Sequence, residues 1–367
     1  MTFKAMDLFA GAGGLGLGLQ WAGWDVIAAN EFEPVFAESY RINHPHTDVI
    51  CGDVLSPEVQ ERLFSYAGKV DLIAGGPPCQ GFSTVGKKDE DDPRNRLFYT
   101  FLDVVRIVKP RVVLFENVSG FKRMYEGRAY ERLVGLLEAE GYTTSHSILD
   151  ALDFGVPQSR LRTFVVGLAG SQPFSFPEPS HLKGVGLFGG EQQLTLQDAL
   201  SDLPIIHSGE IAVRYAAAPA NSFQQRMRAG AGEILTEHEG PHHGDKLLHM
   251  ISHVPKGGSI QDIPEELRPR SYFANTYARL WWDRPAPTIT RNLGTPSSSR
   301  CIHPFADRGL STREGARLQS FPDSYRFSGT RSEKNLQIGN AVPPLLGEAM
   351  GQAVAQSLCS RPSAVNA

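Results

Sequence analysis

The 367-residue sequence predicts an α/β fold, in which a mixed, mostly parallel sheet carries helices on both faces and a smaller, loop-rich region is attached. Segments of strand and helix character alternate over the first 170 residues, which predicts βαβ units. The composition, 41% hydrophobic and 21% charged, is typical of a packed globular protein and excludes a disordered one. After Gly170 the alternation stops, and glycine, proline, serine and histidine become frequent.

Short apolar segments bounded by turn residues predict the strands. The segment 70–74 is typical of a short buried strand, and the strand at 112–116 is expected to stop at Asn117. Another strand-like stretch ends at Gly52-Asp53. The remaining predicted strands are 3–9, 25–30, 143–149 and 163–168.

Apolar side chains at helical spacing predict the helices between these strands. In the segment 96–109, Leu97, Phe101 and Val105 recur at that spacing. Pro34 suits the start of a helix at 35–43, and Gly141 suits the end of one at 130–140. The other predicted helices are 14–22, 57–66, 311–319 and 344–358.

Cysteine usage, charge and hydropathy exclude several classes of protein. The four cysteines are far apart and form no CxxC pair, which argues against a disulfide framework and a thiolate zinc site and favours a reducing cytosol. The net charge of -4 shows no overall basic excess, although a local basic face can exist within an acidic total. No membrane span is predicted, and Asp7 with several glycines argues against an N-terminal signal peptide.

A glycine-rich loop follows the first predicted strand. Gly11, Gly13 and Gly16 fit the pattern GxGxxG, and Glu31 follows at the end of the next strand. Such a loop lets backbone N–H groups approach a ligand, and a carboxylate at this spacing suits ribose hydroxyls. The pattern predicts a nucleoside-bearing cofactor and leaves NAD, FAD and S-adenosylmethionine open. A purely structural glycine turn is the alternative.

A second loop, residues 75–83, contains two prolines followed by Cys79 and is flanked by glycines. It follows a predicted strand, where loops of an α/β sheet line the ligand crevice. Cys79 is therefore positioned like a nucleophile, whereas Cys51, Cys301 and Cys359 are expected to be structural.

The sequence resembles the DNA (cytosine-5) methyltransferases of the bacterial restriction–modification type. The resemblance covers residues 1–170 and about 279–350. The motifs that carry it occur in the order of the family and are FAGAGG at 9–14, PPCQGFS at 77–83, ENV at 116–118, QSRLR at 158–162, REGARLQSFP at 313–322 and QIGNAVPP at 337–344.

This resemblance implies a Rossmann-like methyltransferase fold that uses S-adenosylmethionine and releases S-adenosylhomocysteine, without a metal. The catalytic domain is expected at 1–175 and 335–367, and a target-recognition domain at 176–334. The residues that the resemblance assigns to the cofactor pocket are Phe9, Gly11, Gly13, Glu31, Asp53, Pro78, Leu97, Asn340 and Val342.

The resemblance also implies a mechanism, because cytosine C5 is too weak a nucleophile to accept a methyl group directly. A Cys79 thiolate would add to C6 and enrich C5 in electrons. Glu116 would serve N3 of the base, and Arg160 and Arg162 would face O2, the Glu116 carboxylate or a phosphate. The target base would first be flipped out of the duplex. A solvated surface pair is the alternative for the two arginines.

The partner implied is double-stranded DNA, for which Gln80, Ser83, Arg279 and Arg291 are candidate contacts. His249 and His253 have helical spacing, but polar surface or DNA contact is favoured over a metal site because no third ligand is suitably spaced. A monomer in the bacterial cytoplasm, associated with the nucleoid, is expected. A cognate restriction endonuclease would act on the same site without direct contact.

Three other functions are compatible with parts of the sequence. An NAD-dependent oxidoreductase explains the glycine loop and Glu31 but leaves PPCQ, ENV and QSRLR unexplained. A non-catalytic DNA-binding module predicts loss of Cys79 or Glu116, and both are present. A transfer RNA methyltransferase retains the chemistry, but that branch of the family lacks a large recognition domain.

Overall fold

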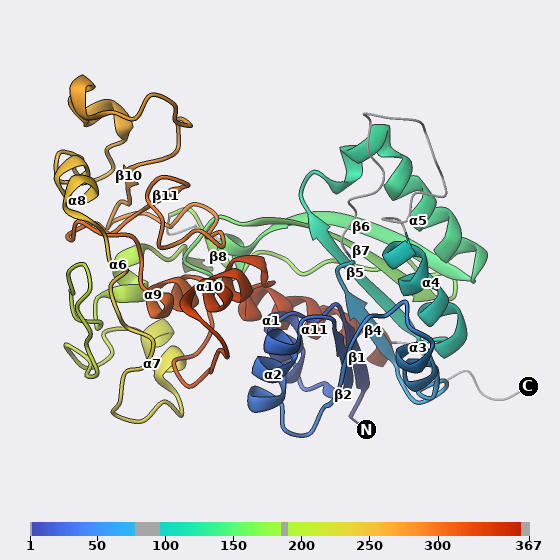
Figure 1. Ribbon diagram of the computed structural model, residues 1–367. Helices are drawn as coiled ribbons and strands as arrows, with labels where there is room; N and C mark the ends of the chain where they lie inside the picture. The colour runs from blue at the N-terminus through green and yellow to red at the C-terminus, as the bar shows by residue number, and fades with distance from the viewer. Residues whose placement is uncertain (1, 78–95, 185–189, 361–367) are drawn as a thin grey trace, which may run out of the picture. The chain divides into compact units, whose positions relative to one another are not determined.

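The computed structural model describes residues 2–77, 96–184 and 190–360 (Figure 1). The chain divides into two compact units. Unit 1 comprises Met1–Asp150, Leu161–Glu178 and Leu346–Ala367, and unit 2 comprises Ala151–Arg160 and Pro179–Leu345. The segments 151–160 and 335–345, expected in the catalytic domain, therefore group with unit 2.

Unit 1 is built on one seven-stranded sheet with the strand order β3-β2-β1-β4-β5-β7-β6 (Figure 1). Neighbouring strands are parallel except at β7, which is antiparallel to both β5 and β6. The mixed, mostly parallel sheet of the prediction is therefore confirmed. The strands are β1 (Lys4–Leu8), β2 (Asp25–Glu31), β3 (Asp48–Cys51), β4 (Leu72–Gly75), β5 (Val112–Val118), β6 (Tyr142–Asp150) and β7 (Leu161–Ala169).

Helices cover both faces of this sheet. On one face, α3 (Pro57–Phe64), α4 (Arg96–Val108) and α5 (Arg128–Ala139) bury apolar side chains against β1, β4 and β5. Ser56 caps α3 by accepting a hydrogen bond from the backbone N–H of Val59, and Pro57 begins the helix. On the other face, α2 (Pro34–Asn43) packs on β2 and β3, and α1 (Gly14–Trp21) lies beside it.

The last helix, α11 (Pro344–Cys359), packs on α1, near the other end of the chain. Gly347 and Gly351 lie against Leu15 and Leu19, where a larger side chain would crowd the contact. The indole N–H of Trp24 also donates to the carbonyl of Gly351 over 2.9 Å. Unit 1 is thus assembled from both ends of the sequence.

Unit 2 contains little regular structure apart from short helices. Its four strands form two separate pairs, and none is longer than three residues among those described. The helix α10 was not predicted, although Thr330 and Glu333 form a capping box at its start. The elements are η3 (Ala151–Phe154), β8 (His181–Leu182), β9 (Glu191–Gln192), α6 (Leu196–Leu200), α7 (Ser222–Arg228), α8 (Asp245–Ser252), η4 (Ile260–Asp262), η5 (Glu265–Leu267), β10 (Ala278–Arg279), β11 (Arg300–Ile302), α9 (Thr312–Leu318) and α10 (Arg331–Asn340).

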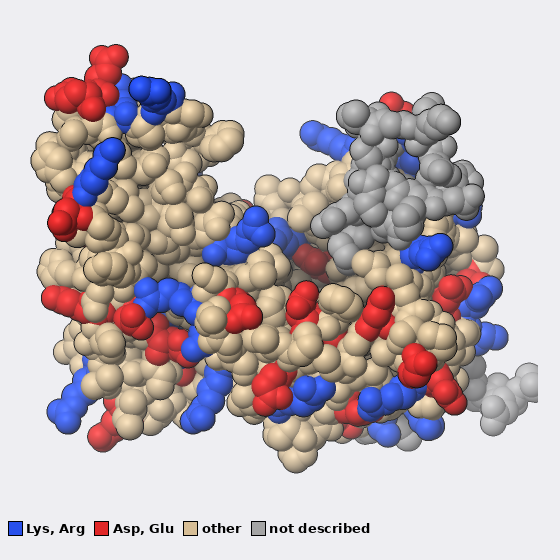
Figure 2. All heavy atoms as spheres, in the orientation of Figure 1, with Lys and Arg blue, Asp and Glu red and all other residues tan. Residues whose placement is uncertain are grey.

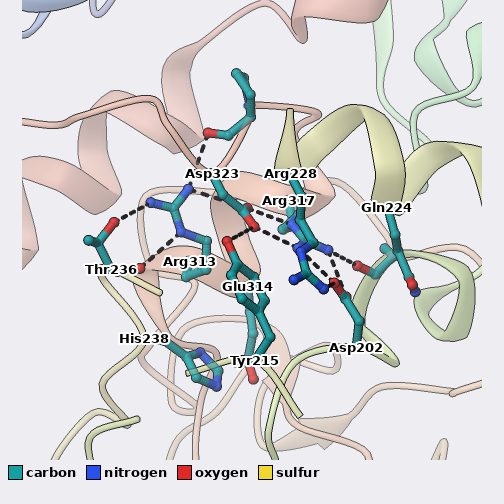
Figure 3. A network of polar contacts seen from close by, with 12 residues as sticks. Asp202, Tyr215, Gln224, Arg228, Thr236, His238, Arg313, Glu314, Arg317 and Asp323 are labelled. Atoms are coloured by element: carbon teal, nitrogen blue, oxygen red, sulfur yellow. Dashed lines mark hydrogen bonds and ion pairs between the residues drawn. The ribbon is translucent and has the colours of Figure 1, made fainter. Parts of the chain in front are cut away.

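Buried ion pairs organise unit 2 around α9 (Figure 3). Arg317 pairs with Asp202 over 2.9 Å and with Asp323 over 2.6 Å, and all three side chains are buried. Arg308 holds both carboxylate oxygens of Glu314, whose pKa is kept well below its usual range by that guanidinium despite burial. Removing one partner of such a pair costs about 3–5 kcal/mol. The REGARLQSFP motif therefore contributes to the core of this unit.

Charges of both signs are interspersed over much of the face that Figure 2 shows, as expected from a small net charge. Among the described residues, no helix is long and apolar enough to span a membrane.

Candidate active site

The predicted site residues of unit 1 gather where parallel strands of its sheet end. Strands β1, β2, β4 and β5 run in the same direction, so their carboxyl ends meet along one edge. In α/β sheets, loops at this edge form the ligand crevice. The glycine loop follows β1, Glu31 ends β2, Gly76-Pro77 follows β4, and Glu116 lies near the end of β5.

The glycine loop needs its glycines for two different reasons. Gly11 and Gly13 have φ angles of 58° and 92°, in the left-handed region that favours glycine. Gly16 lies inside α1, where a Cβ would overlap the Tyr40 hydroxyl and lie 2.9 Å from Oδ2 of Asp7. The first two glycines therefore shape the turn, and the third allows close packing beneath it.

Glu31 anchors the loop from the neighbouring strand. Its carboxylate accepts hydrogen bonds from the backbone N–H of Gly11 over 2.7 Å and of Glu33 over 2.9 Å. Burial raises the pKa of this carboxyl, because little water remains to solvate its charge. A buried acid beside the turn of a glycine loop can accept hydrogen bonds from the hydroxyls of a ribose.

Asp53 follows β3, next to Gly52, which bonds to Glu31 at the end of β2. The backbone N–H of Gly52 donates to the carbonyl of Glu31 over 2.9 Å, and the Asn30 amide donates to the carbonyls of Ile50 and Gly52. Asp53 itself is half-buried, and its carboxylate accepts the backbone N–H of Leu55 over 2.9 Å. The ends of β2 and β3 are thus tied together beside the glycine loop.

The other predicted cofactor residues fall into three groups. Phe9 and Leu97 are half-buried in unit 1, and Phe9 has a φ angle of 56° where the glycine loop begins. Asn340 is exposed at the end of α10 and Val342 is 9% exposed, and both belong to unit 2. Pro78 lies outside the described residues.

A buried polar cluster beneath the glycine loop was missed by the sequence analysis. The Tyr40 hydroxyl donates to Oδ2 of Asp7 over 3.3 Å, and both side chains are buried. Burial raises the pKa of Asp7 to about 7. His44 stacks on Tyr40, with ring centres 4.2 Å apart, and contacts the Gln20 side chain over 2.9 Å. The position of Asp7 directly before the loop was the one signal available.

Glu116 forms an ion pair with Arg162. Nε of Arg162 lies 2.9 Å from Oε1 of Glu116, and each side chain is 13% exposed. Glu116 pairs with Phe164 in the antiparallel ladder, so Arg162 is its diagonal neighbour on the same face. Of the three partners expected for Arg162, the structure shows the Glu116 carboxylate.

Glu116 also lies against the segment that leads to the cysteine loop. A Cβ on Gly76 would lie 2.7 Å from Oε2 of Glu116, so the backbone here passes very close to the carboxylate. The Asn117 amide donates to the carbonyl of Pro77 over 3.1 Å. The ENV segment therefore positions the last described residues before Cys79. Cys79, Gln80 and Ser83 lie outside the described residues.

Arg160 does not have the surroundings that a catalytic role requires. Its side chain is 1% exposed, and the guanidinium donates to the carbonyls of Ile289 over 2.9 Å and Gly339 over 2.7 Å. Gln158 similarly contacts Leu318 and Gln319. The structure gives Arg160 a scaffold role in unit 2 in place of the predicted catalytic one.

The two candidate DNA-binding arginines differ in exposure. Arg279 is 5% exposed, and its guanidinium donates to four backbone carbonyls and pairs with Asp307. The structure therefore corrects the expectation that Arg279 contacts DNA, because its donors are used inside the protein. Arg291 is exposed, and its DNA contact stays a prediction.

His249 and His253 lie close together, with ring centres 5.1 Å apart. Within the described part of the chain, no three His, Cys, Asp or Glu side chains group as metal ligands.

Comparisons with known proteins identify the family. The model for C-5 cytosine-specific DNA methylases matches residues 3–356, and the chain belongs to this family. It is accordingly a DNA (cytosine-5)-methyltransferase, as the motifs had indicated.

Two relatives align over nearly the whole chain. The Type II methyltransferase M.AgeI of Thalassovita gelatinovora is 34% identical, over 96% of this chain and 99% of the relative. The Type II methyltransferase M.DdeI of Desulfomicrobium norvegicum is 36% identical, over 95% of this chain and 88% of the relative.

Solved structures share the fold. One from E. coli, described as a DNA modification methyltransferase encoded within a prophage, has a TM-score of 0.78 at 26% identity and covers 98% of this chain and 100% of its own. The S. pombe Dnmt2 methyltransferase has a TM-score of 0.64 at 20% identity, over 97% and 99% of the two chains, and supports the Rossmann-like fold alone.

Proposed function

We propose that the chain transfers a methyl group from S-adenosylmethionine to C5 of a flipped-out cytosine in a specific double-stranded DNA sequence, through a covalent bond between Cys79 and C6. The observation that carries this proposal is the Glu116–Arg162 pair. It lies against Gly76 at the sheet edge that also holds the glycine loop and Glu31. The strand order thus brings Glu116, Arg162, the glycine loop and Glu31 to one edge of unit 1, where the segment that leads to Cys79 also begins.

The residues of the glycine loop fit S-adenosylmethionine. Around the position that a Gly11 Cβ would take, no described heavy atom lies within 4 Å, so the loop is open there to a ligand. Glu31 would hold the ribose hydroxyls, Asp53 the adenine amino group, and Phe9 the adenine ring. Gly13, Leu97 and Pro78 belong to the same proposed pocket, and the cofactor contacts of Asn340 and Val342 stay predictions from the sequence. When bound, S-adenosylmethionine supplies an electrophilic methyl group.

The proposed chemistry assigns a role to each reactive side chain. The Cys79 thiolate would form a bond to C6, and the displaced ring electrons would increase the density at C5. C5 would then take the methyl group as its bond to the cofactor sulfur breaks, which leaves S-adenosylhomocysteine. The Glu116 carboxyl group donates a hydrogen bond to N3, where charge develops. Arg162 orients that carboxyl group through its contact with Oε1. A base then removes the C5 proton, the ring electrons return, and the bond between sulfur and C6 breaks.

The wider setting is also proposed. The names of the relatives support a bacterial enzyme of a restriction–modification system. We further propose that it acts as a monomer in the cytoplasm and associates with the nucleoid. A cognate endonuclease would cut the same DNA site without contacting this chain.

Bisulfite sequencing of DNA from a bacterial host that expresses the chain tests the activity. We expect one short sequence to become protected at a single cytosine with the wild-type chain and to stay unprotected with Cys79→Ser. Cys359→Ser, which changes an exposed cysteine outside the site, is the matched control and should behave as wild type. Protection that persists in Cys79→Ser would refute the thiolate mechanism.

The cofactor is tested separately by thermal denaturation of the purified chain. We expect S-adenosylhomocysteine to raise the melting temperature and NAD to leave it unchanged. Glu31→Gln should reduce the S-adenosylhomocysteine effect. Stabilisation by NAD alone would favour the oxidoreductase alternative.

A further inference from the structure

We propose that unit 2 carries a binding surface for the DNA backbone. On this surface Lys256, Arg284 and Arg300 stack on aromatic side chains and bind phosphodiester oxygens. This cation–aromatic platform rests on the proposed function, because it presupposes DNA as the substrate. It consists of the three cations together with Trp281, Trp282 and Phe305.

Arg300 is the central member of the platform. Its guanidinium lies 4.2 Å from the centre of the Trp281 ring, and Nη1 donates to the carbonyls of Gly257, Gly258 and Arg279 over 2.6–3.1 Å. No carboxylate in the described part of the chain pairs with it. Burial lowers the pKa of Arg300, since its charge is partly withdrawn from water. A partly buried cation held only by carbonyls is suited to binding an anion.

The other two cations also lie over aromatic rings of unit 2. Arg284 lies 5.2 Å from the centre of the Trp281 ring. Lys256 lies 4.0 Å from the centre of Phe305, which contacts Trp282 with ring centres 5.0 Å apart. Stacking on an aromatic face orients a cation and leaves its N–H groups available at the edges.

The backbone fixes this arrangement. Gly257 has a φ angle of 70°, and a Cβ there would overlap the Trp281 indole, so the position requires glycine for both reasons. The buried Arg279 lies in the same framework, where it donates to the carbonyls of Val254 and His303. It thereby ties together the two segments that lead to Lys256 and Phe305.

The charge of the platform is positive and is not balanced by ion pairs. Neither Lys256 nor Arg284 forms an ion pair among the described residues, and both side chains are exposed. Nearby carboxylates are engaged elsewhere: Asp307 pairs with Arg279, and Asp262 caps η4. Asp283 is exposed and adds one negative charge beside three positive ones. Cations presented in this way match the backbone of DNA and read no base sequence.

The salt dependence of DNA binding tests the platform. Each phosphate that a cation neutralises contributes about 0.9 to the slope of log Kobs against log salt concentration. In the triple variant Lys256→Gln, Arg284→Gln, Arg300→Gln, we expect the magnitude of this slope to be smaller by about 2 to 3. Affinity should fall for cognate and unrelated duplexes alike, with a higher KM for DNA and an unchanged kcat.

The controls separate this proposal from loss of folding and from failure of the proposed function. Arg62→Gln removes an exposed cation on α3 and should leave the slope unchanged. If Arg300→Gln lowers the melting temperature, the double variant Lys256→Gln, Arg284→Gln should still lose about 2 from the slope. An unchanged slope, or a loss confined to cognate DNA, overturns the platform even when the wild-type chain methylates DNA. A wild-type chain that binds no DNA overturns both proposals.

Discussion

At the scale of single residues, the Glu116–Arg162 pair is the most informative contact in the structure. We predict that Glu116→Gln lowers kcat by about 10²–10⁴-fold, since the carboxyl group is lost where charge develops on the base. Arg162→Ala should lower kcat less and shift its pH profile, because the cation that faces the carboxyl group is removed. Steady-state kinetics with cognate DNA measures both effects.

A second arginine–carboxylate pair provides the matched control. Arg111 and Asp71 lie 3.5 Å apart just before β5 and β4, at the opposite edge of the sheet. Arg111→Gln should leave kcat and the pH profile unchanged. If it changes them as Arg162→Ala does, the effect at Arg162 is a general loss of sheet stability.

Asp7 leads to a prediction about stability and pH. Its pKa is raised from 3.8 to about 7 by burial, so the folded chain holds a proton that the unfolded chain releases. The proton that the folded chain retains on Asp7 stabilises it fully below about pH 4. This stabilisation is lost as the pH rises to about 7. Between about pH 4 and pH 7, the free energy of unfolding of the wild type should therefore fall relative to that of Asp7→Asn, by about 1.4 kcal/mol per pH unit at most. Urea denaturation at pH 5, 6 and 8 measures it, and a constant difference between the two proteins would contradict the assignment.

At the scale of elements, Gly16 shows how tightly α1 packs beneath the glycine loop. Gly16→Ala would place a methyl group on the Tyr40 hydroxyl, and we expect a loss of about 1–3 kcal/mol in the free energy of unfolding. S-adenosylhomocysteine should bind more weakly to this variant, which calorimetry can measure.

The control is another helical glycine of the same unit. Around the Cβ position of Gly135 in α5, no described heavy atom lies within 4 Å. Gly135→Ala should stabilise the chain by up to about 1 kcal/mol through helix propensity. Equal destabilisation by both substitutions would show that the close packing of α1 is unimportant.

The elements of unit 1 could be predicted from the sequence, whereas those of unit 2 largely could not. Strand and helix periodicity is strong in the first 170 residues because both sheet faces are covered by apolar side chains. In α10 the sequence is mostly polar, and only its capping box indicated a helix. The roles of Arg160 and Arg279 were predicted wrongly because the sequence around an arginine does not show whether its side chain is buried or exposed. Their carbonyl partners come from distant segments of the chain.

At the scale of the whole molecule, the strand order explains why distant motifs act together. The motifs FAGAGG and ENV lie about 100 residues apart, yet β1 and β5 are separated only by β4. The sequence indicated a mostly parallel sheet, but the order of its strands and the reversed direction of β7 depend on tertiary packing. That reversal is what brings Arg162 alongside Glu116.

The central claim is that Cys79 forms a covalent bond to the target base. Incubation with S-adenosylmethionine and cognate duplex DNA that contains 5-fluorocytosine tests it most directly, because fluorine cannot leave as a proton does. We expect a denaturation-resistant complex of chain and DNA with the wild type and with Cys359→Ser, and none with Cys79→Ser. Absence of a complex with the wild type, or its formation with Cys79→Ser, would contradict the account.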